Sequence, residues 1–144
     1  MIAVDTNILV YAHREDSPWH DRAAEVLRAL AEGRAPWAIP WPCVHEFLAI
    51  ATHPRVYAPP SPLASALQFI EELRRAPTLA LLSESGPYWE RLAELARAAR
   101  VHGPKIHDAR IAALCLVGGV SELLSADRDF GRFPELRVRN PLVG

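Results

Sequence analysis

The chain is poor in several features that would point to a class of protein. Of its 16 basic residues only Lys105 is a lysine, and the net charge of −1 gives no overall positive signature. If the protein binds nucleic acid, its positively charged surface must be local. Acidic residues gathered in one cleft would cancel that surface's charge in the net charge of the chain.

Cysteines and long apolar runs are also scarce. Cys43 and Cys115 lie in segments expected to be helical and follow no metal-binding spacing, so we expect buried thiols in a reducing compartment. No apolar stretch approaches the roughly 18 residues that indicate a membrane span. The first residues lack the basic segment of a signal peptide, and Asp5 interrupts their apolar run. These absences predict a cytoplasmic protein without a membrane partner.

The chain is expected to fold as one domain over residues 1–144, since it is 50% hydrophobic and long enough for a real core. Strands are expected at residues 2–4, 37–39, 79–82, 122–124 and 136–138. Helices are expected at residues 7–13, 18–32, 42–53, 62–75, 87–101 and 105–117. This alternation predicts an α/β fold of three layers, in which helices cover both faces of a short, mainly parallel, twisted sheet.

Four acidic residues stand where carboxylates are unusual. Asp5 ends an apolar strand, and Glu46 interrupts an apolar helix. Asp108 lies in the first turn of another apolar helix, and Asp127 follows a late strand. Carboxylates are rarely buried unless they are paired or bind a metal, and no comparable set of basic residues accompanies these four. We therefore expect them to converge on a hard divalent cation, which prefers oxygen ligands.

Parallel sheets bind ligands beyond the carboxyl ends of their strands, and three of the acids map to that edge. Asp5, Asp108 and Asp127 are the expected direct ligands. Glu46 would bind directly or through water, provided that its helix leans over the edge. Asp129 is the alternative to Asp127, which is favoured because it comes first after the strand.

Three neighbouring side chains are expected to orient the acids. Thr6 and Asn7 follow Asp5 and are suited to hold its carboxylate. Ser125 is expected to do the same for Asp127 or to contact a phosphate.

Each acid also has an ordinary explanation of its own. Asp5 can cap a helix, and Asp108 can simply favour a helix N-terminus. Glu46 can pair with a nearby basic residue, and Asp127 and Asp129 can form a turn. These explanations are independent of one another, so the joint occurrence of the acids favours the metal site.

Together these motifs resemble the PIN domain and, more narrowly, the VapC-type ribonuclease toxins of prokaryotic toxin–antitoxin systems. The resemblance covers the whole chain and rests on Val4-Asp5-Thr6-Asn7, Glu46, Lys105-Ile106-His107-Asp108-Ala109 and Ser125-Ala126-Asp127-Arg128-Asp129-Phe130. It implies an endoribonuclease dependent on Mg²⁺ or Mn²⁺, a homodimer, and a small VapB-type antitoxin that blocks RNA cleavage. The catalytic carboxylates that it implies are Asp5, Glu46, Asp108 and Asp127.

Two other functions remain open on the residues alone. A haloacid-dehalogenase-like phosphatase also places an aspartate after its first strand, but Asn7 stands where its second aspartate would be. A catalytically silent PIN fold would act as a scaffold or binding module, although such members usually lack one or more acids.

An antitoxin helix would need an apolar channel beside the acids. Residues 5–19 and 37–57 are the expected walls. The expected apolar anchors are Phe47, Ile50, Val56 and Tyr57. The four tryptophans are expected mainly in the core, with some open to lining such a groove.

Overall fold

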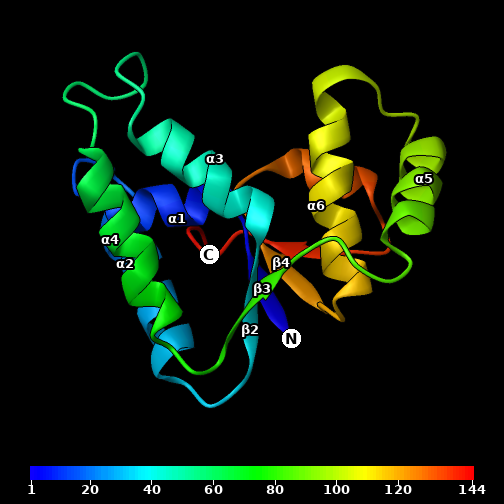
Figure 1. Cartoon of the computed structure of the whole chain (residues 1–144), viewed down its shortest axis with the longest axis horizontal. Coiled ribbons are helices and arrows are strands. Elements are labelled where there is room, and N and C mark those ends of the chain that lie inside the picture. The colour runs from blue at the N-terminus through cyan, green and yellow to red at the C-terminus, as the bar shows by residue number, and fades with distance from the viewer.

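The computed structural model describes residues 1–144 and shows helices on both sides of a five-stranded sheet (Figure 1). The strands are β1 (Ile2–Val4), β2 (Trp37–Pro40), β3 (Leu79–Leu82), β4 (Glu122–Leu124) and β5 (Arg137–Arg139). The α-helices are α1 (Thr6–His13), α2 (His20–Glu32), α3 (Trp41–Ala51), α4 (Leu63–Arg74), α5 (Tyr88–Ala99) and α6 (Ile106–Val117). Two short 3₁₀ helices are η1 (Gly103–Lys105) and η2 (Arg128–Arg132).

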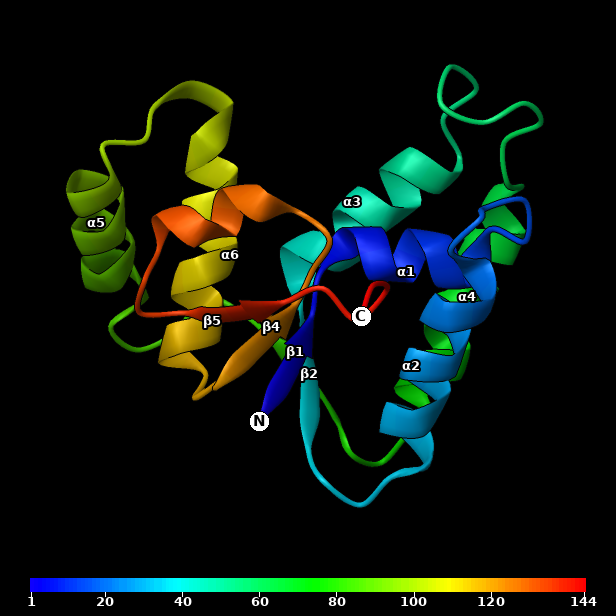
Figure 2. The ribbon, with the colours of Figure 1, turned by 180° about the vertical axis from the view of Figure 1, so that it is seen from behind.

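The strand order explains the layering. All neighbouring strands pair in parallel, in the order β3-β2-β1-β4-β5. The first two crossovers run from β1 towards β3, whereas the third passes back over β1 to β4. Because such crossovers are right-handed, the reversal places α5 and α6 on the face opposite α1 to α4. Figures 1 and 2 show these three layers, which confirm the predicted fold class.

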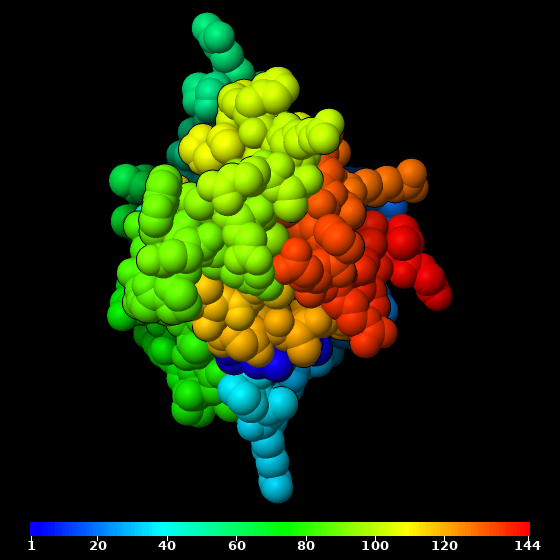
Figure 3. Space-filling model, turned by 90° about the vertical axis from the view of Figure 1, so that its right-hand side faces the viewer, coloured from blue at the N-terminus to red at the C-terminus, as the bar shows by residue number.

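A continuous core of 29 buried residues fills the space between the layers. Strand β2 is buried along its whole length, and Trp37 at its start is fully covered while its indole nitrogen donates to Thr78 Oγ1 at 3.0 Å. Trp19 and Trp89 depart from the expectation for tryptophans, since they are 42% and 69% exposed. Trp89 lies on α5, which forms the outer surface in Figure 3 beside the segment of η2 and β5. None of the helices combines the length and apolar character needed to cross a membrane.

The predicted helix after Ser17-Pro18 begins later than expected. Ser17 Oγ accepts from the Trp19 backbone amide at 3.1 Å and forms a turn, and α2 starts only at His20. The Ser17 side chain therefore stabilises the turn that precedes α2 and does not cap the helix.

The reversal of the chain also creates the switch point of the sheet. Strands β1 and β4 lie side by side, with Val4 opposite Leu124, and the Asp5 amide donates to the Leu124 carbonyl at 3.0 Å. Crevices for ligands form where the strand order reverses, beyond the carboxyl ends of the strands. The residues that follow β1 and β4 therefore meet at one edge, and α6, which runs back into β4, begins there.

Candidate active site

Asp5 lies at the switch point with both carboxylate oxygens occupied. It caps α1 by accepting from the Thr6 amide at 2.8 Å, so the ordinary role of a helix cap is present. Its other oxygen accepts from Ser125 Oγ at 2.7 Å and from Asn7 Nδ2 at 3.3 Å. The Cys43 thiol donates a further, longer contact of 3.5 Å. Asp5 is thus fixed from four directions while it is only 4% exposed.

Burial raises the pKa of the Asp5 carboxyl above its ordinary value, and its hydrogen-bond donors act in the opposite direction. Burial also raises the pKa of Cys43 far above the normal range and that of Cys115 to about 12, so both thiols stay protonated. Both are free cysteines in the core, as the sequence predicted.

Asn7 connects Asp5, which follows β1, to Ser125 and Ala126, which follow β4. Its side-chain nitrogen contacts Asp5 and Ser125, each at 3.3 Å, and its oxygen accepts from the Ala126 amide at 3.1 Å. Ser125 Oγ in turn accepts from the Asp127 backbone amide at 3.0 Å. The Asn7 side chain contacts the Asp5 carboxylate as expected, whereas Thr6 does so only through its backbone amide, because its hydroxyl donates to Glu46. The contact of Ser125 with the Asp5 carboxylate was not foreseen, because it depends on the pairing of β1 with β4.

Glu46 reaches the same edge from α3. The helix starts directly after β2 and packs against α1, and Thr6 Oγ1 donates to Glu46 Oε2 at 2.8 Å. Glu46 makes no ion pair with a neighbouring basic residue. The lean of α3 that the sequence argument had to assume is therefore present.

Asp108, Asp127 and Asp129 form a second group of acids. One carboxylate oxygen from each lies within 4.8 Å of the others, and all three residues are partly buried. Asp108 stands in the first turn of α6, while Asp127 caps η2 by accepting from the Asp129 amide at 2.8 Å. The turn that could explain the Asp-x-Asp pattern is thus present, and it also brings its carboxylates close to Asp108.

Lys105 is the basic neighbour that the sequence argument missed. It forms an ion pair with Asp129, and its Nζ lies 3.9 Å from Asp108 Oδ2. The ion pair lowers the pKa of Asp129. Asp108 still has a raised pKa, because burial and the charge of Asp127 outweigh the lysine. The spacing of Lys105 three residues before Asp108 on a helix was the available signal.

The chemistry of this site fits a hard divalent cation. Four of the acids, Asp5, Glu46, Asp108 and Asp127, line one pocket of about 340 Å³. The donors are oxygen atoms, and no neutral nitrogen or sulfur ligand competes with them for a softer metal. One lysine cannot balance so many carboxylates.

An apolar groove continues from the acids. Val10, Ile50, Val56 and Tyr57 contribute to the same pocket, so three of the four residues expected as anchors do line it. Phe47 was the wrong choice, because it is fully buried and packs against His13 and Phe69 on the core side of α3.

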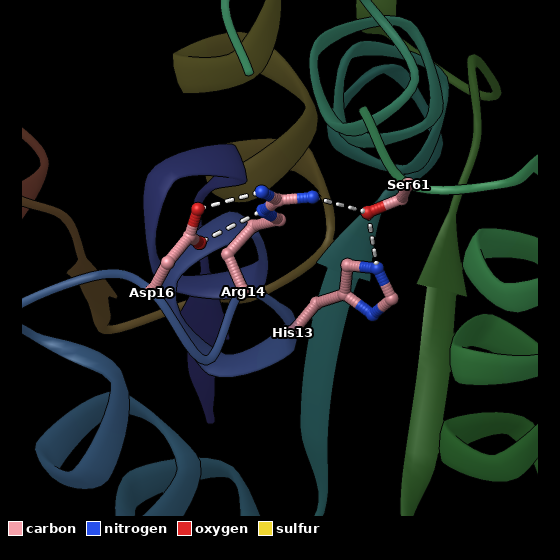
Figure 4. A network of polar contacts seen from close by, with 4 residues as sticks. All are labelled: His13, Arg14, Asp16 and Ser61. Atoms are coloured by element: carbon pink, nitrogen blue, oxygen red, sulfur yellow. Dashed lines mark hydrogen bonds and ion pairs between the residues drawn. The ribbon is translucent and has the colours of Figure 1, made fainter. Parts of the chain in front are cut away.

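A polar network holds the loop that forms the outer wall of this groove (Figure 4). Arg14 pairs with Asp16 at 2.6 Å, donates to Ser61 Oγ at 3.2 Å and lies 4.2 Å from the centre of the Tyr57 ring. His13 Nε2 lies 2.9 Å from the same serine oxygen. The end of α1 thus fastens residues 52–62, on which Val56 and Tyr57 stand.

This network predicts a pH dependence of stability. Burial, and secondly the charge of Arg14, lower the pKa of His13 below its ordinary 6.5. As the pH falls through 6.5 the unfolded chain binds the proton first, so the fold loses stability until the pH passes the lower, folded pKa. The free energy of unfolding, measured by urea titration, should fall more steeply as the pH drops through 6.5 in the wild type than in His13→Gln. Parallel curves would show that His13 is equally easy to protonate in both states.

The sequence is similar to a family of known domains and to individual proteins of that family. A model of the PIN domain matches residues 2–136. Ribonuclease VapC43 of Mycobacterium tuberculosis is 36% identical over 144 residues, which is 100% of this chain and 97% of that protein. Ribonuclease VapC31 of the same species is 35% identical, covering 99% of this chain and all of that protein.

Solved structures with low sequence identity share the fold. The sarcin–ricin loop cleaving toxin VapC20 of Mycobacterium tuberculosis has a TM-score of 0.66 at 18% identity, covering 95% of this chain and 99% of that one. VapBC2 of Rickettsia felis, solved with a DNA fragment of its promoter, has a TM-score of 0.64 at 21% identity, covering 97% and 98%. The match to the PIN domain model and the whole-chain identity to two VapC ribonucleases lead to one assignment: the chain belongs to the PIN domain family, among the VapC ribonucleases.

Proposed function

We propose that this protein is an endoribonuclease that hydrolyses RNA phosphodiester bonds with the help of divalent cations, Mg²⁺ or Mn²⁺. The observation that carries the proposal is the convergence of Asp5, Glu46, Asp108 and Asp127 on one pocket at the switch point of the sheet. Full-length relatives at 35% and 36% identity are named ribonucleases, which favours RNA over a phosphate monoester.

The acids have separable tasks in this proposal. Asp5, Asp108 and Asp127 hold the cations, which when bound would polarise a phosphate oxygen and activate a water. Asp127 is preferred to Asp129 as a ligand because Lys105 already occupies the Asp129 carboxylate. Hydrolysis adds the water across one P–O bond, so a proton must leave the water and another must reach the departing oxygen.

Glu46 is the group proposed to receive the proton from the water. Thr6 Oγ1 holds its Oε2, whereas Oε1 faces no donor from the protein. A carboxylate fixed through one oxygen and free at the other can accept a proton within hydrogen-bond reach of the attacking water.

The proposal is tested by incubating the purified protein with cellular RNA and mapping the cleaved ends. Cleavage should require Mg²⁺ or Mn²⁺, stop in excess EDTA and return when the ion is restored. A phosphatase would instead release phosphate from small esters, and we expect none. Cleavage that continues in EDTA would contradict a carboxylate-held cation mechanism.

We also propose an antitoxin and a homodimer as partners. An amphipathic helix suits the apolar groove of Ile50, Val56 and Tyr57. An arginine of that partner would enter the acid cluster and pair with two carboxylates. Dimerisation would use a separate apolar face, and two alternatives on opposite sides of the sheet are the exposed Leu63 and Leu67 of α4 or the exposed Trp89 of α5.

A further inference from the structure

A second hollow adjoins the acid pocket on the other side of Glu46. It has a volume of about 260 Å³ and lies between α3 and α6. Its lining residues are Pro42, His45, Glu46, His107 and Arg110. Apart from Pro42 the lining residues, which are His45, Glu46, His107 and Arg110, carry polar or charged groups. Glu46 belongs to both, so one side chain separates the hollow from the site of hydrolysis.

The hollow carries donors for an anion. His107 and Arg110 stand three residues apart on α6, and His45 faces them from α3. Neither imidazole ring makes a hydrogen bond within the protein. Arg110 contacts Glu84 Oε1 through two nitrogen atoms, at 3.2 and 3.3 Å, and the two side chains are 36% and 51% exposed. Exposed ion pairs are weak, so the guanidinium remains available to a phosphate.

A flat aromatic surface lies beside these donors. The ring of Trp41 stacks on His45 with centroids 6.0 Å apart and planes inclined by 23°. Both side chains come from the first turns of α3, and His45 is exposed. Unpaired bases stack on aromatic side chains, and this kind of contact distinguishes single-stranded RNA from a simple anion or an acidic peptide.

We propose that the hollow is a subsite for single-stranded RNA. It binds the phosphate of a nucleotide next to the scissile bond through Arg110 and His107, and a base stacks against Trp41 and His45. This inference rests on the proposed ribonuclease function. The acid cluster repels the RNA backbone, and the Arg110 cation beyond Glu46 offsets part of that repulsion.

The first test measures RNA affinity in an Asp108→Asn background, in which no cleavage disturbs the titration. Adding Arg110→Met should weaken the binding of a single-stranded oligoribonucleotide by about tenfold, as expected for one charge-assisted contact. The slope of log affinity against log salt should become shallower by about 0.7, the value for one neutralised phosphate of a single strand. In the cleaving protein, Arg110→Met should raise KM more than it lowers kcat.

Two matched variants separate the subsite from structural effects. Glu84→Gln breaks the same ion pair but keeps the Arg110 cation, so RNA affinity should stay at the wild-type level or rise. Arg97→Met removes an exposed arginine of α5 that forms no ion pair, and it should change neither affinity nor salt slope. A loss shared by all three variants would overturn the proposal.

The second test places one uncharged methylphosphonate at each position flanking the cleavage site. In the wild type, the methylphosphonate at one position should weaken RNA affinity about as much as Arg110→Met does. In the Arg110→Met protein the same methylphosphonate should have no further effect on affinity, because both changes remove the same contact. If the wild type cleaves RNA and Arg110→Met matches it in every measurement, the subsite is refuted and the ribonuclease stands. If the wild type neither binds nor cleaves RNA, the subsite and the proposed ribonuclease function are both refuted. If Arg110→Met weakens only a protein partner, the hollow is a protein-binding site instead.

Discussion

Replacing Asp108 with asparagine should reduce RNA cleavage by more than about 100-fold, since groups that merely support metal ligands already cost about 10–100-fold when removed. Asp5→Asn and Glu46→Gln should have effects of the same order. The rate is measured at saturating Mg²⁺ on one defined oligoribonucleotide. Asp21→Asn, an acid-to-amide change on the exposed start of α2, is the matched control and should leave the rate unchanged.

Loss of folding would not explain this result. Burial, and then the charge of Asp127, raise the pKa of Asp108, so the metal-free fold disfavours its charged form. That penalty is absent at low pH and grows as the pH rises from the unfolded value of 3.8 through the raised one. Metal-free Asp108→Asn should therefore melt at or above the wild-type temperature at neutral pH. If Asp108→Asn cleaved RNA at the wild-type rate, Asp108 would be excluded from the mechanism.

Expression of the wild-type chain without an inhibitor should stop the growth of a bacterial host, and expression of Asp108→Asn should not. This follows from the proposed ribonuclease activity, because RNA cleavage without restraint halts protein synthesis. Co-expression of a cognate antitoxin, sought in a neighbouring small gene, should restore growth and give a complex that survives purification.

The apolar groove supplies a variant that separates toxicity from inhibition. Val56 is 52% exposed and lines the groove. Val56→Glu should remain toxic and should no longer be neutralised, because a charge in the groove opposes the burial of an apolar helix face. If the wild-type chain is harmless when expressed alone and cleaves no RNA, the ribonuclease function is excluded and the catalytically silent scaffold or binding module remains.

The sequence predicted the layers and the order of elements well, because short apolar strands alternate with segments of helical length. Single acids at strand ends could be mapped to one edge by the rule for parallel sheets. The bond from Ser125 to Asp5 could not, since it spans 120 residues and depends on β4 pairing with β1. Lys105 was overlooked for a similar reason, because its partner Asp129 lies 24 residues away.

Helix α3 shows a different limit. Its sequence is apolar on nearly every side, so the pattern alone cannot tell which face turns inward. Phe47 was therefore assigned to the groove although it belongs to the core. Packing against α1 decides the rotation of the helix, and the same rotation brings Glu46 to Thr6.

The Asn7 bridge has a consequence for the timing of synthesis. It joins residues near the start of the chain to Ser125 and Ala126, which are 118 and 119 positions later. The ribosome makes β1 first, but the other half of the site exists only when β4 and the segment after it have emerged. A growing chain that has not yet reached β4 therefore lacks one side of the acid site, and the site can form only after that strand and Asp127 have been made.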